Sequence, residues 1–147
     1  MIQLKEIDRQ NFSAVIKLKV ADEQQSFVAS NVLSLAQAKV YPECVCWAIY
    51  NDETLVGFTM YCLDHEDQEY WIYRLMIDAR HQGKGYGKAA MELVIEQLQR
   101  DPEHHVMYLS FEPENTAAQK LYEKLGFRAD GRVIDREIVY KLNYERY

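Results

Sequence analysis

The chain has 147 residues, of which 48% are hydrophobic and 27% charged, and its formal net charge at pH 7 is −6. This balance is typical of one globular domain, here expected to span residues 1–147, and the negative charge argues against nucleic acid as a partner. No apolar run approaches the roughly 20 residues that a membrane-spanning helix needs, and we expect no secretory signal. The three cysteines, an odd number, favour reduced thiols in a cytoplasmic protein without a metal site.

The first half of the chain is expected to form a strand, two helices and an antiparallel meander of three strands. Alternating apolar and polar residues mark the strands, and apolar residues three and four apart mark the helices. In chain order we predict a strand at 2–7, a helix with Phe12, Val15 and Ile16 on one face, a polar loop at 22–26, a helix at 30–39 with Val32, Leu35 and Ala36 inward, and strands at 45–50, 55–63 and 70–77.

A glycine-rich turn follows the last of these strands. Gly83, Gly85 and Gly87 are half of the six glycines in the chain, and Lys84 and Lys88 add positive charge to the same stretch. Glycine permits a positive φ and a close approach of a ligand to the main chain, and a helix that begins here points free N–H groups at an anion. The sequence therefore predicts a phosphate-binding turn, with a turn that binds nothing as the alternative.

Two common phosphate-binding patterns do not fit this turn. The Walker pattern G-x-x-x-x-G-K-S/T needs a hydroxyl where Ala89 stands, and the dinucleotide pattern G-x-G-x-x-G has a different glycine spacing. The pattern that fits is Q/R-x-x-G-x-G/A, with Gln82, Gly85 and Gly87 at its fixed positions.

The second half of the chain predicts two more helices and the closing strands. In chain order these are a helix at 88–100 with Ala90, Leu93, Val94, Gln97 and Leu98 on one stripe, a strand at 106–110, a helix after Asn115 with Ala118, Leu121, Tyr122 and Leu125 on its apolar stripe, Gly126 just after its C-cap, and a hairpin of strands 127–129 and 133–142 around Asp130-Gly131. The whole chain reads as a mixed α/β (α+β) domain of about seven strands and four helices.

Residues 115–127 carry a second pattern, N-x-x-A-x-x-L-Y-x-x-x-G-F, one helix and one strand after the glycine turn. Together the two patterns resemble the signatures of the GNAT superfamily of N-acetyltransferases, and the resemblance covers essentially the whole chain. The amino-acid sequence of residues 70–78, 82–87 and 108–115 is similar to that of bacterial spermine/spermidine (diamine) N-acetyltransferases. The resemblance implies the GNAT acyl-CoA N-acyltransferase fold and transfer of an acetyl group from acetyl-CoA to a primary amine of a polyamine, by direct attack in a ternary complex.

The resemblance also implies residue roles on the donor side. A main-chain N–H near Met76, where the strand would bulge and splay from the strand that ends at Ser110, polarises the thioester carbonyl. Tyr122 faces the thioester sulfur as the catalytic acid, although a buried core tyrosine fits the same position. Asn115 would hold the pantetheine amide or a water, and it can also cap its helix. The residues expected to bind the cofactor are Leu75, Met76, Ile77, Gln82, Gly83, Lys84, Gly85, Tyr86, Gly87, Lys88, Asn115 and Tyr122.

The acceptor side is less defined by the sequence. Many relatives carry a glutamate where this chain has Tyr73, so we expect the amine to lose its proton through water in place of a direct carboxylate base. Tyr73, Glu43, Glu69 and Glu112 are the candidates for acceptor binding, and the three glutamates fit a solvated surface charge at least as well. The resemblance implies that the loop at 22–26 helps to form this side of the site.

Other functions stay open at this point. The chain could acetylate another acceptor, such as a protein N-terminus or an aminoglycoside, or act as a non-catalytic sensor of acyl-CoA. A ping-pong route through a cysteine is a second mechanism, which the lack of a histidine beside each thiol in sequence disfavours. The resemblance leaves a homodimer open, because dimers are frequent in the family.

Overall fold

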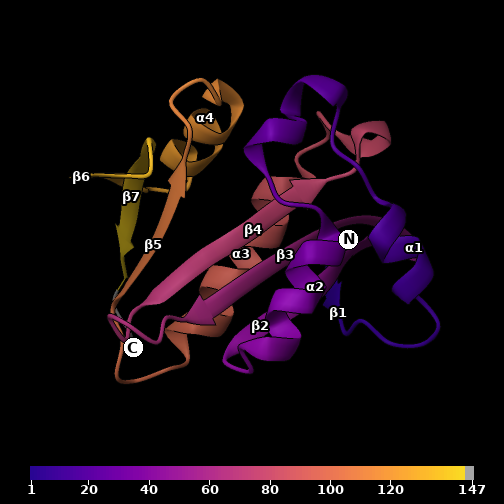
Figure 1. Cartoon of the computed structure of the whole chain (residues 1–147), viewed down its shortest axis with the longest axis horizontal. Coiled ribbons are helices and arrows are strands. Elements are labelled where there is room, and N and C mark those ends of the chain that lie inside the picture. The colour runs from indigo at the N-terminus through magenta and orange to yellow at the C-terminus, as the bar shows by residue number, and fades with distance from the viewer. Residues whose placement is uncertain (145–147) are drawn as a thin grey trace.

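A seven-stranded mixed sheet with helices on both faces makes up the fold (Figure 1). The computed structural model describes residues 1–144. The elements in chain order are β1 (Ile2–Lys5), α1 (Phe12–Lys17), the 3-10 helix η1 (Asp22–Phe27), α2 (Asn31–Val40), β2 (Cys44–Asn51), β3 (Thr54–Leu63), β4 (Tyr70–Ile77), the 3-10 helix η2 (Ala79–His81), α3 (Tyr86–Gln99), β5 (Val106–Phe111), α4 (Thr116–Lys124), β6 (Arg128–Ile134) and β7 (Glu137–Asn143). Across the described residues, no helix has the length and apolar character needed to span a membrane.

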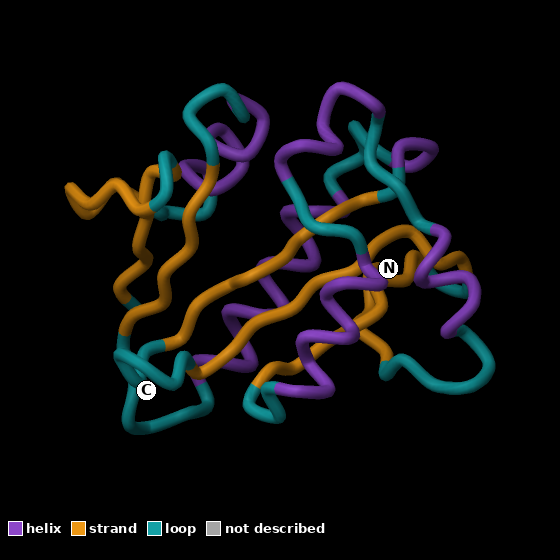
Figure 2. The backbone as a smooth tube through the Cα atoms, in the orientation of Figure 1, coloured by secondary structure: helices purple, strands orange, loops and turns teal. Residues whose placement is uncertain are grey.

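The strand order is β1-β2-β3-β4-β5-β7-β6, and only β4 and β5 run parallel among these neighbours. The two parallel strands pair only through Tyr70 with Met107 and Trp71 with Tyr108. Beyond Trp71 they diverge, and we call the space between them the wedge (Figures 1 and 2). The mixed sheet with four α-helices confirms the predicted fold class.

The helices bury the apolar side chains of both sheet faces. On the front face, toward the viewer in Figure 1, Val15 of α1 and its C-cap residue Leu18 pack into one cluster with residues of β2, β3 and β4. On the back face, α3 and α4 share a cluster with β3, β4, β5 and β7. The buried stripe of α3 includes Met91, which the sequence pattern missed. Gln97, the polar member of the predicted stripe, accepts a hydrogen bond from the Tyr61 hydroxyl at 2.9 Å.

β4 carries a bulge beside the wedge. The register between β3 and β4 shifts there and leaves Tyr73 without a partner on β3. An extra residue in one strand changes which face the following side chains occupy. Ile72 before the bulge and Leu75 after it therefore both pack against the back-face cluster, while Arg74 turns to α2 on the front. The bulge lies three residues earlier than Met76, where the sequence predicted it.

The predicted hairpin around Asp130-Gly131 is wrong. The strands reverse at Asp135 and Arg136, whose φ angles of 49° and 70° are those of a tight two-residue turn. Asp130 and Gly131 lie inside β6, where the register with β7 shifts. The Asp130 carboxylate accepts the N–H of Arg132 at 2.9 Å, which shapes a local bulge, and Asp-Gly suits such a bulge as well as it suits a turn.

Two predictions for the N-terminal helices are also wrong. Residues 22–26 belong to the 3-10 helix η1 and do not form an open loop. In α2, Val32 is 55% exposed and Ala36 is exposed, whereas Asn31 and Ser34 are buried. The buried polar pair has specific partners: Asn31 donates to a carbonyl of α1 at 2.9 Å, and Ser34 accepts from the β4 guanidinium at 3.1 Å. These hydrogen bonds, and not the apolar periodicity of the sequence, determine which face of α2 is buried.

Candidate active site

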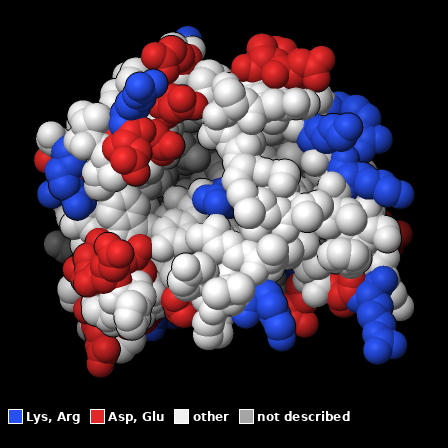
Figure 3. Space-filling model, in the orientation of Figure 1, with Lys and Arg blue, Asp and Glu red and all other residues white. Residues whose placement is uncertain are grey.

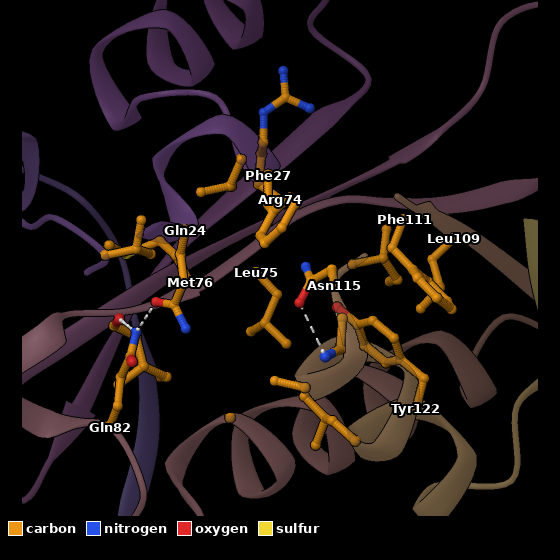
Figure 4. Close-up of a pocket in the computed structure, with 18 of the residues that line it drawn as sticks. Gln24, Phe27, Arg74, Leu75, Met76, Gln82, Leu109, Phe111, Asn115 and Tyr122 are labelled. Carbon is orange, nitrogen blue, oxygen red and sulfur yellow. Dashed lines mark hydrogen bonds between the residues drawn. The ribbon is translucent and has the colours of Figure 1, made fainter. Parts of the chain in front are cut away.

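The wedge between β4 and β5 holds a pocket of about 760 Å³. Its wall comes from η1 and the segment after it, β4, the glycine turn with the start of α3, β5, α4 and the first residue of β7 (Figure 4). It is lined by Val20, Gln24, 26–29, 71–77, 81–83, 85–87, 109–111, Asn115, Ala117, Ala118, Leu121, Tyr122 and Glu137. Two sequence patterns far apart in the chain therefore meet at one cavity.

The glycine turn presents main-chain N–H groups to this pocket. Gly83 and Gly85 have φ angles of 78° and 81°, and a Cβ built on either would meet no other atom within 4 Å. Gly85 is the N-cap of α3 and offers no side chain to cap the helix. The first helical hydrogen bond runs from the Ala89 N–H to the Gly85 carbonyl at 3.2 Å. The N–H groups before it are free to bind an anion, and no acidic residue lies in that first turn.

The edge of β4 that faces the wedge is set by the pairing with β3. The Asp78 N–H donates to the Val56 carbonyl at 2.8 Å, in the same register that pairs the two strands. Because hydrogen bonding alternates along an antiparallel ladder, the main chain of Met76 also faces β3, and that of Leu75 and Ile77 faces the wedge. The main-chain N–H that faces the wedge beside Met76 is therefore that of Leu75.

A hydrogen-bond relay fixes the glycine turn to its surroundings. The Gln82 side chain donates to the Ile77 carbonyl at 2.9 Å and to Gln24 Oε1 at 2.8 Å (Figure 4). It thereby ties β4 and η1 to the turn. Just before the turn, Asp78 is buried and caps η2. Burial alone would raise the pKa of Asp78, but hydrogen bonds from Arg80 and the main chain hold it below its usual range.

α4 brings two polar side chains to the pocket. Asn115 is the N-cap of α4, and its Oδ1 accepts the Ala118 N–H at 3.2 Å. The Tyr122 ring extends from α4 toward the middle of the pocket and is 9% exposed (Figure 4). It packs against Phe111 and Phe127, with ring centroids 6.0 and 5.7 Å away. Burial raises the pKa of the Tyr122 hydroxyl, which therefore stays protonated at neutral pH.

Ser110 and Glu137 approach the same pocket from the front face. Side chains alternate along a strand, so Ser110 points away from the back face on which Phe111 meets Tyr122. The Ser110 hydroxyl donates to Glu137 Oε1 at 2.7 Å. Within residues 1–144, Glu137 is the only carboxylate on the pocket wall, and Arg74 is the only lysine or arginine there. The pocket thus has a phenol on its back side and a carboxylate on its front side.

Five residues predicted for the site do not line the pocket. Lys84 and Lys88 belong to the glycine turn and the start of α3, but their side chains are outside the wall. Glu43 precedes β2, Glu69 precedes β4 and Glu112 follows β5, and the structure brings none of the three to the wall. The sequence chose these glutamates for their charge and their closeness to predicted strands, and neither property fixes the direction of a side chain.

Two predicted tyrosines line the pocket with their hydroxyls already engaged elsewhere. The Tyr73 hydroxyl donates to Asp64 Oδ2 at 2.6 Å, and burial together with this bond raises the Tyr73 pKa. The Tyr86 hydroxyl accepts from Asn51 Nδ2 at 3.0 Å, on the side of β2. Tyr73 is therefore a wall residue and a poor base.

Gln24 and Ser26 line the pocket and come from the segment 22–26, which was expected on the acceptor side as a loop and forms part of η1. Sequence reasoning missed Phe27, Arg74 and Glu137, which also line the pocket. Phe27 directly follows the predicted loop, and Arg74 lies beside the bulge that reverses its face. Glu137 lies outside both sequence patterns and reaches the wall only because β7 pairs beside β5. No local signal marked it, since strand order is a long-range property.

The three cysteines lie outside the wall of the pocket. Cys44, Cys46 and Cys62 are free thiols, and none of them lines the pocket. Burial raises the pKa of Cys44, that of Cys46 to about 11 and that of Cys62 to about 12, so each is a poor nucleophile. Within the described part of the chain, no group of three or more histidine, cysteine or acidic side chains could hold a metal ion.

Known proteins resemble this chain in sequence. A family model described as "Acetyltransferase (GNAT) family" matches residues 3–127. The spermine/spermidine N(1)-acetyltransferase of Bacillus subtilis (strain 168) is 33% identical over 141 residues, which is 90% of this chain and 91% of that protein.

Solved structures share the fold at low sequence identity. The spermidine N-acetyltransferase of Vibrio cholerae, crystallised with CoA and spermine, has a TM-score of 0.77 and 16% identity, over 97% of this chain and 95% of that one. The ribosomal-protein-S18-alanine N-acetyltransferase of Escherichia coli has a TM-score of 0.72 and 16% identity, over 100% of this chain and 96% of that one. These two neighbours differ in acceptor, so the shared fold does not by itself decide the acceptor.

Proposed function

Because the chain belongs to the acetyltransferase (GNAT) family, we propose that it acetylates a primary amine of a polyamine. The family makes it an N-acetyltransferase that uses acetyl-CoA. The polyamine acceptor is supported by the Bacillus subtilis relative, whose similarity runs over nearly the whole chain. The observation that carries the proposal is the wedge, where an anion-binding turn, strand N–H groups and a buried phenol line one pocket.

We assign the diphosphate of acetyl-CoA to the glycine turn and the start of α3. The residues present fit it, because the turn offers N–H groups without a Cβ in the way, at the positive end of a 14-residue helix. Lys84 and Lys88 stand outside the pocket wall and add positive charge nearby. The main chain of Leu75 and Ile77 and the amide of Asn115 hold the pantetheine arm.

The residues of the wedge then act on the thioester that acetyl-CoA supplies. The Leu75 N–H donates to the carbonyl oxygen as negative charge grows there. Tyr122 donates its hydroxyl proton to the leaving sulfur as the C–S bond breaks, and burial keeps that phenol protonated before the step. The proton that the attacking nitrogen releases on forming the amide returns to Tyr122 through water. Direct attack by the amine is favoured over a cysteine intermediate, because no thiol lines the pocket and burial raises the pKa of all three.

The acceptor amine enters from the front face and must lose a proton, since a free alkyl ammonium has a pKa of about 10.4. Tyr73 already donates to Asp64, so we propose that water carries the proton away. Acidic side chains gather on the margins of the hollow in the front face, over α4 and η1, and favour the approach of a cation (Figure 3). We also propose a cytoplasmic location, because the three cysteines are free thiols.

A thiol-release assay with acetyl-CoA tests this function. Spermine, spermidine and 1,4-diaminobutane are compared with an alanine-terminated peptide and an aminoglycoside, and a reaction without amine gives the background. We expect the polyamines to have kcat/KM values about tenfold or more above the other acceptors. Preference for the peptide or the aminoglycoside would move the chain to another acceptor. Tight CoA binding without turnover of any amine would make it a sensor.

A further inference from the structure

We infer that Glu137 binds the non-reacting ammonium of a cationic acceptor at the front of the wedge and so selects polyamines over monoamines. This inference rests on the proposed function and adds to it the residue that binds the second ammonium group of the acceptor. Glu137 lies outside both sequence patterns, one strand after the second of them, and the pairing of β7 with β5 brings it to the pocket.

The position of Glu137 is fixed by two neighbours. It is the first residue of β7, directly after the tight turn at Asp135 and Arg136. β7 pairs with β5 so that Ser110 lies opposite Val139, which places Glu137 diagonally across from Ser110 on the same face. The Ser110 hydroxyl donates to Glu137 Oε1 at 2.7 Å and holds the carboxylate toward the pocket.

Glu137 has no cation of its own chain within ion-pair distance in residues 1–144. Arg74, the only arginine or lysine on the wall, directs its guanidinium to Ser34 Oγ at 3.1 Å, Gln37 Oε1 at 3.0 Å and the Tyr73 carbonyl at 2.9 Å. In Figure 4 the Arg74 guanidinium points away from Asn115 and Tyr122. Burial lowers the Arg74 pKa and the Glu137 charge acts at a distance to raise it, but the two side chains form no ion pair among the described residues. The half-buried carboxylate therefore has a hydrogen bond from Ser110 and no ion-pair partner, and a cation from outside the chain is the fitting occupant.

The surroundings of Glu137 suit a polyamine better than a compact cation. Phe27, Trp71 and Tyr73 line the same pocket. Their rings provide apolar surface for the methylene groups between two nitrogens, and their faces attract ammonium groups. Tyr122 marks the reacting end on the back side of β5, so an acceptor that spans the pocket reaches from the thioester to Glu137.

A purely structural role for Glu137 makes a different prediction. The bond to Ser110 could serve only to join β5 to β7. Glu137→Gln separates the two roles, because the amide oxygen still accepts from Ser110 while the negative charge is lost. Glu112→Gln is the matched control, since Glu112 directly follows β5 but does not line the pocket.

The experiment compares kcat/KM for spermidine and for butylamine, which lacks the second charge, in wild type, E137Q and E112Q. We expect E137Q to lower kcat/KM for spermidine about tenfold or more, mainly through KM, and to leave butylamine turnover, CoA affinity and Tm near wild type. E112Q should match wild type with both amines. Calorimetric titration of spermidine into the CoA complex gives the same comparison without turnover, and E137D should retain part of the affinity.

The possible outcomes distinguish a failure of the role of Glu137 from a failure of the proposed function. Wild-type efficiency of E137Q with spermidine overturns the role of Glu137 and leaves the proposed function standing. An equal loss with spermidine and butylamine also overturns it, because the charge would then act on the reacting amine or on the fold. Failure of wild type to acetylate or bind any polyamine removes the proposed function, and this inference with it.

Discussion

At the scale of single residues, the two faces of β5 divide the chemistry. Tyr122 stands behind the strand among Phe111 and Phe127, and its phenol stays protonated because burial raises its pKa. Glu137 stands in front, where its carboxylate accepts the hydrogen bond from Ser110. In the mechanism we propose, the leaving sulfur and the incoming cation therefore meet different residues.

Replacement of Tyr122 by Phe tests the role of the phenol. We expect Tyr122→Phe to lower kcat about 10²- to 10⁴-fold, the usual range for loss of a positioned acid, with the Kd for CoA changed less than about twofold. Tyr140→Phe is the matched control: its ring also packs on Phe111, with centroids 4.7 Å apart, but its hydroxyl donates to Glu123 away from the wedge. Thiol-release rates and CoA titrations measure both variants, and similar kcat values for the two would remove Tyr122 from the mechanism.

The sequence predicted those site residues that occupy fixed positions in short sequence motifs. Gly85 and Tyr122 occupy fixed positions of two motifs, and both line the pocket. Glu137 could not be found in this way, because its place on the wall depends on pairing between β5 and β7. Glu112 illustrates the converse, since it is close in sequence to the site and still absent from the wall. Local pattern identifies a residue type, whereas sheet topology decides which side chains share a cavity.

At the scale of elements, the glycine turn works through backbone conformation. Gly85→Ala forces a side chain onto a φ of 81°, which costs about 1–2 kcal/mol or rotates the N–H groups of the turn. We expect this variant to raise the Kd for CoA about tenfold. Gly131→Ala is the control, with a φ of 97° at a bulge in β6 outside the pocket wall. Equal CoA affinity of the two variants, measured by titration, would contradict a diphosphate site at the turn.

The strands were predicted more accurately than the connections between them. Tyr70–Ile77 has the predicted limits, because apolar and aromatic residues bounded by polar turns favour a strand strongly. The bulge inside that strand was expected near Met76 and lies at Tyr73, and the turn at Asp135 and Arg136 was predicted at Asp130-Gly131. Both depend on cross-strand register, which the identity of neighbouring residues does not determine.

At the scale of the whole molecule, a polar network joins the start of β4 to the segment between α3 and β5, near the point where the two strands pair. Asp101 Oδ2 accepts from the Tyr70 hydroxyl at 2.7 Å and lies 3.0 Å from His104 Nδ1. His104 Nε2 lies 3.0 Å from the Gln68 carbonyl. Both neighbours of the ring are acceptors, so the doubly protonated imidazolium satisfies both. Burial lowers the His104 pKa, but the hydrogen bonds to Gln68 and Asp101 outweigh it, and the net pKa is raised.

This network predicts a pH dependence of stability. Because the folded-state pKa of His104 is raised above the usual value of about 6.5, its contribution is fully present below that value and is lost as pH rises through the folded pKa. The free energy of unfolding of wild type should therefore exceed that of His104→Gln most at low pH, and the difference should shrink toward alkaline pH. Urea titrations between about pH 5 and 9 measure this, with the exposed His65→Gln as control. A pH-independent difference would exclude the charged form.

The divergence of β4 from β5 has a last consequence for turnover. The pocket wall includes α3 and α4 as well as η1 and β7, so in the function we propose acetyl-CoA and the amine contact different elements. We therefore expect CoA to be exchanged while an amine is bound, and the acetylated product to leave while CoA stays bound. Because β4 and β5 already diverge beyond Trp71, neither step requires a strand pair to separate.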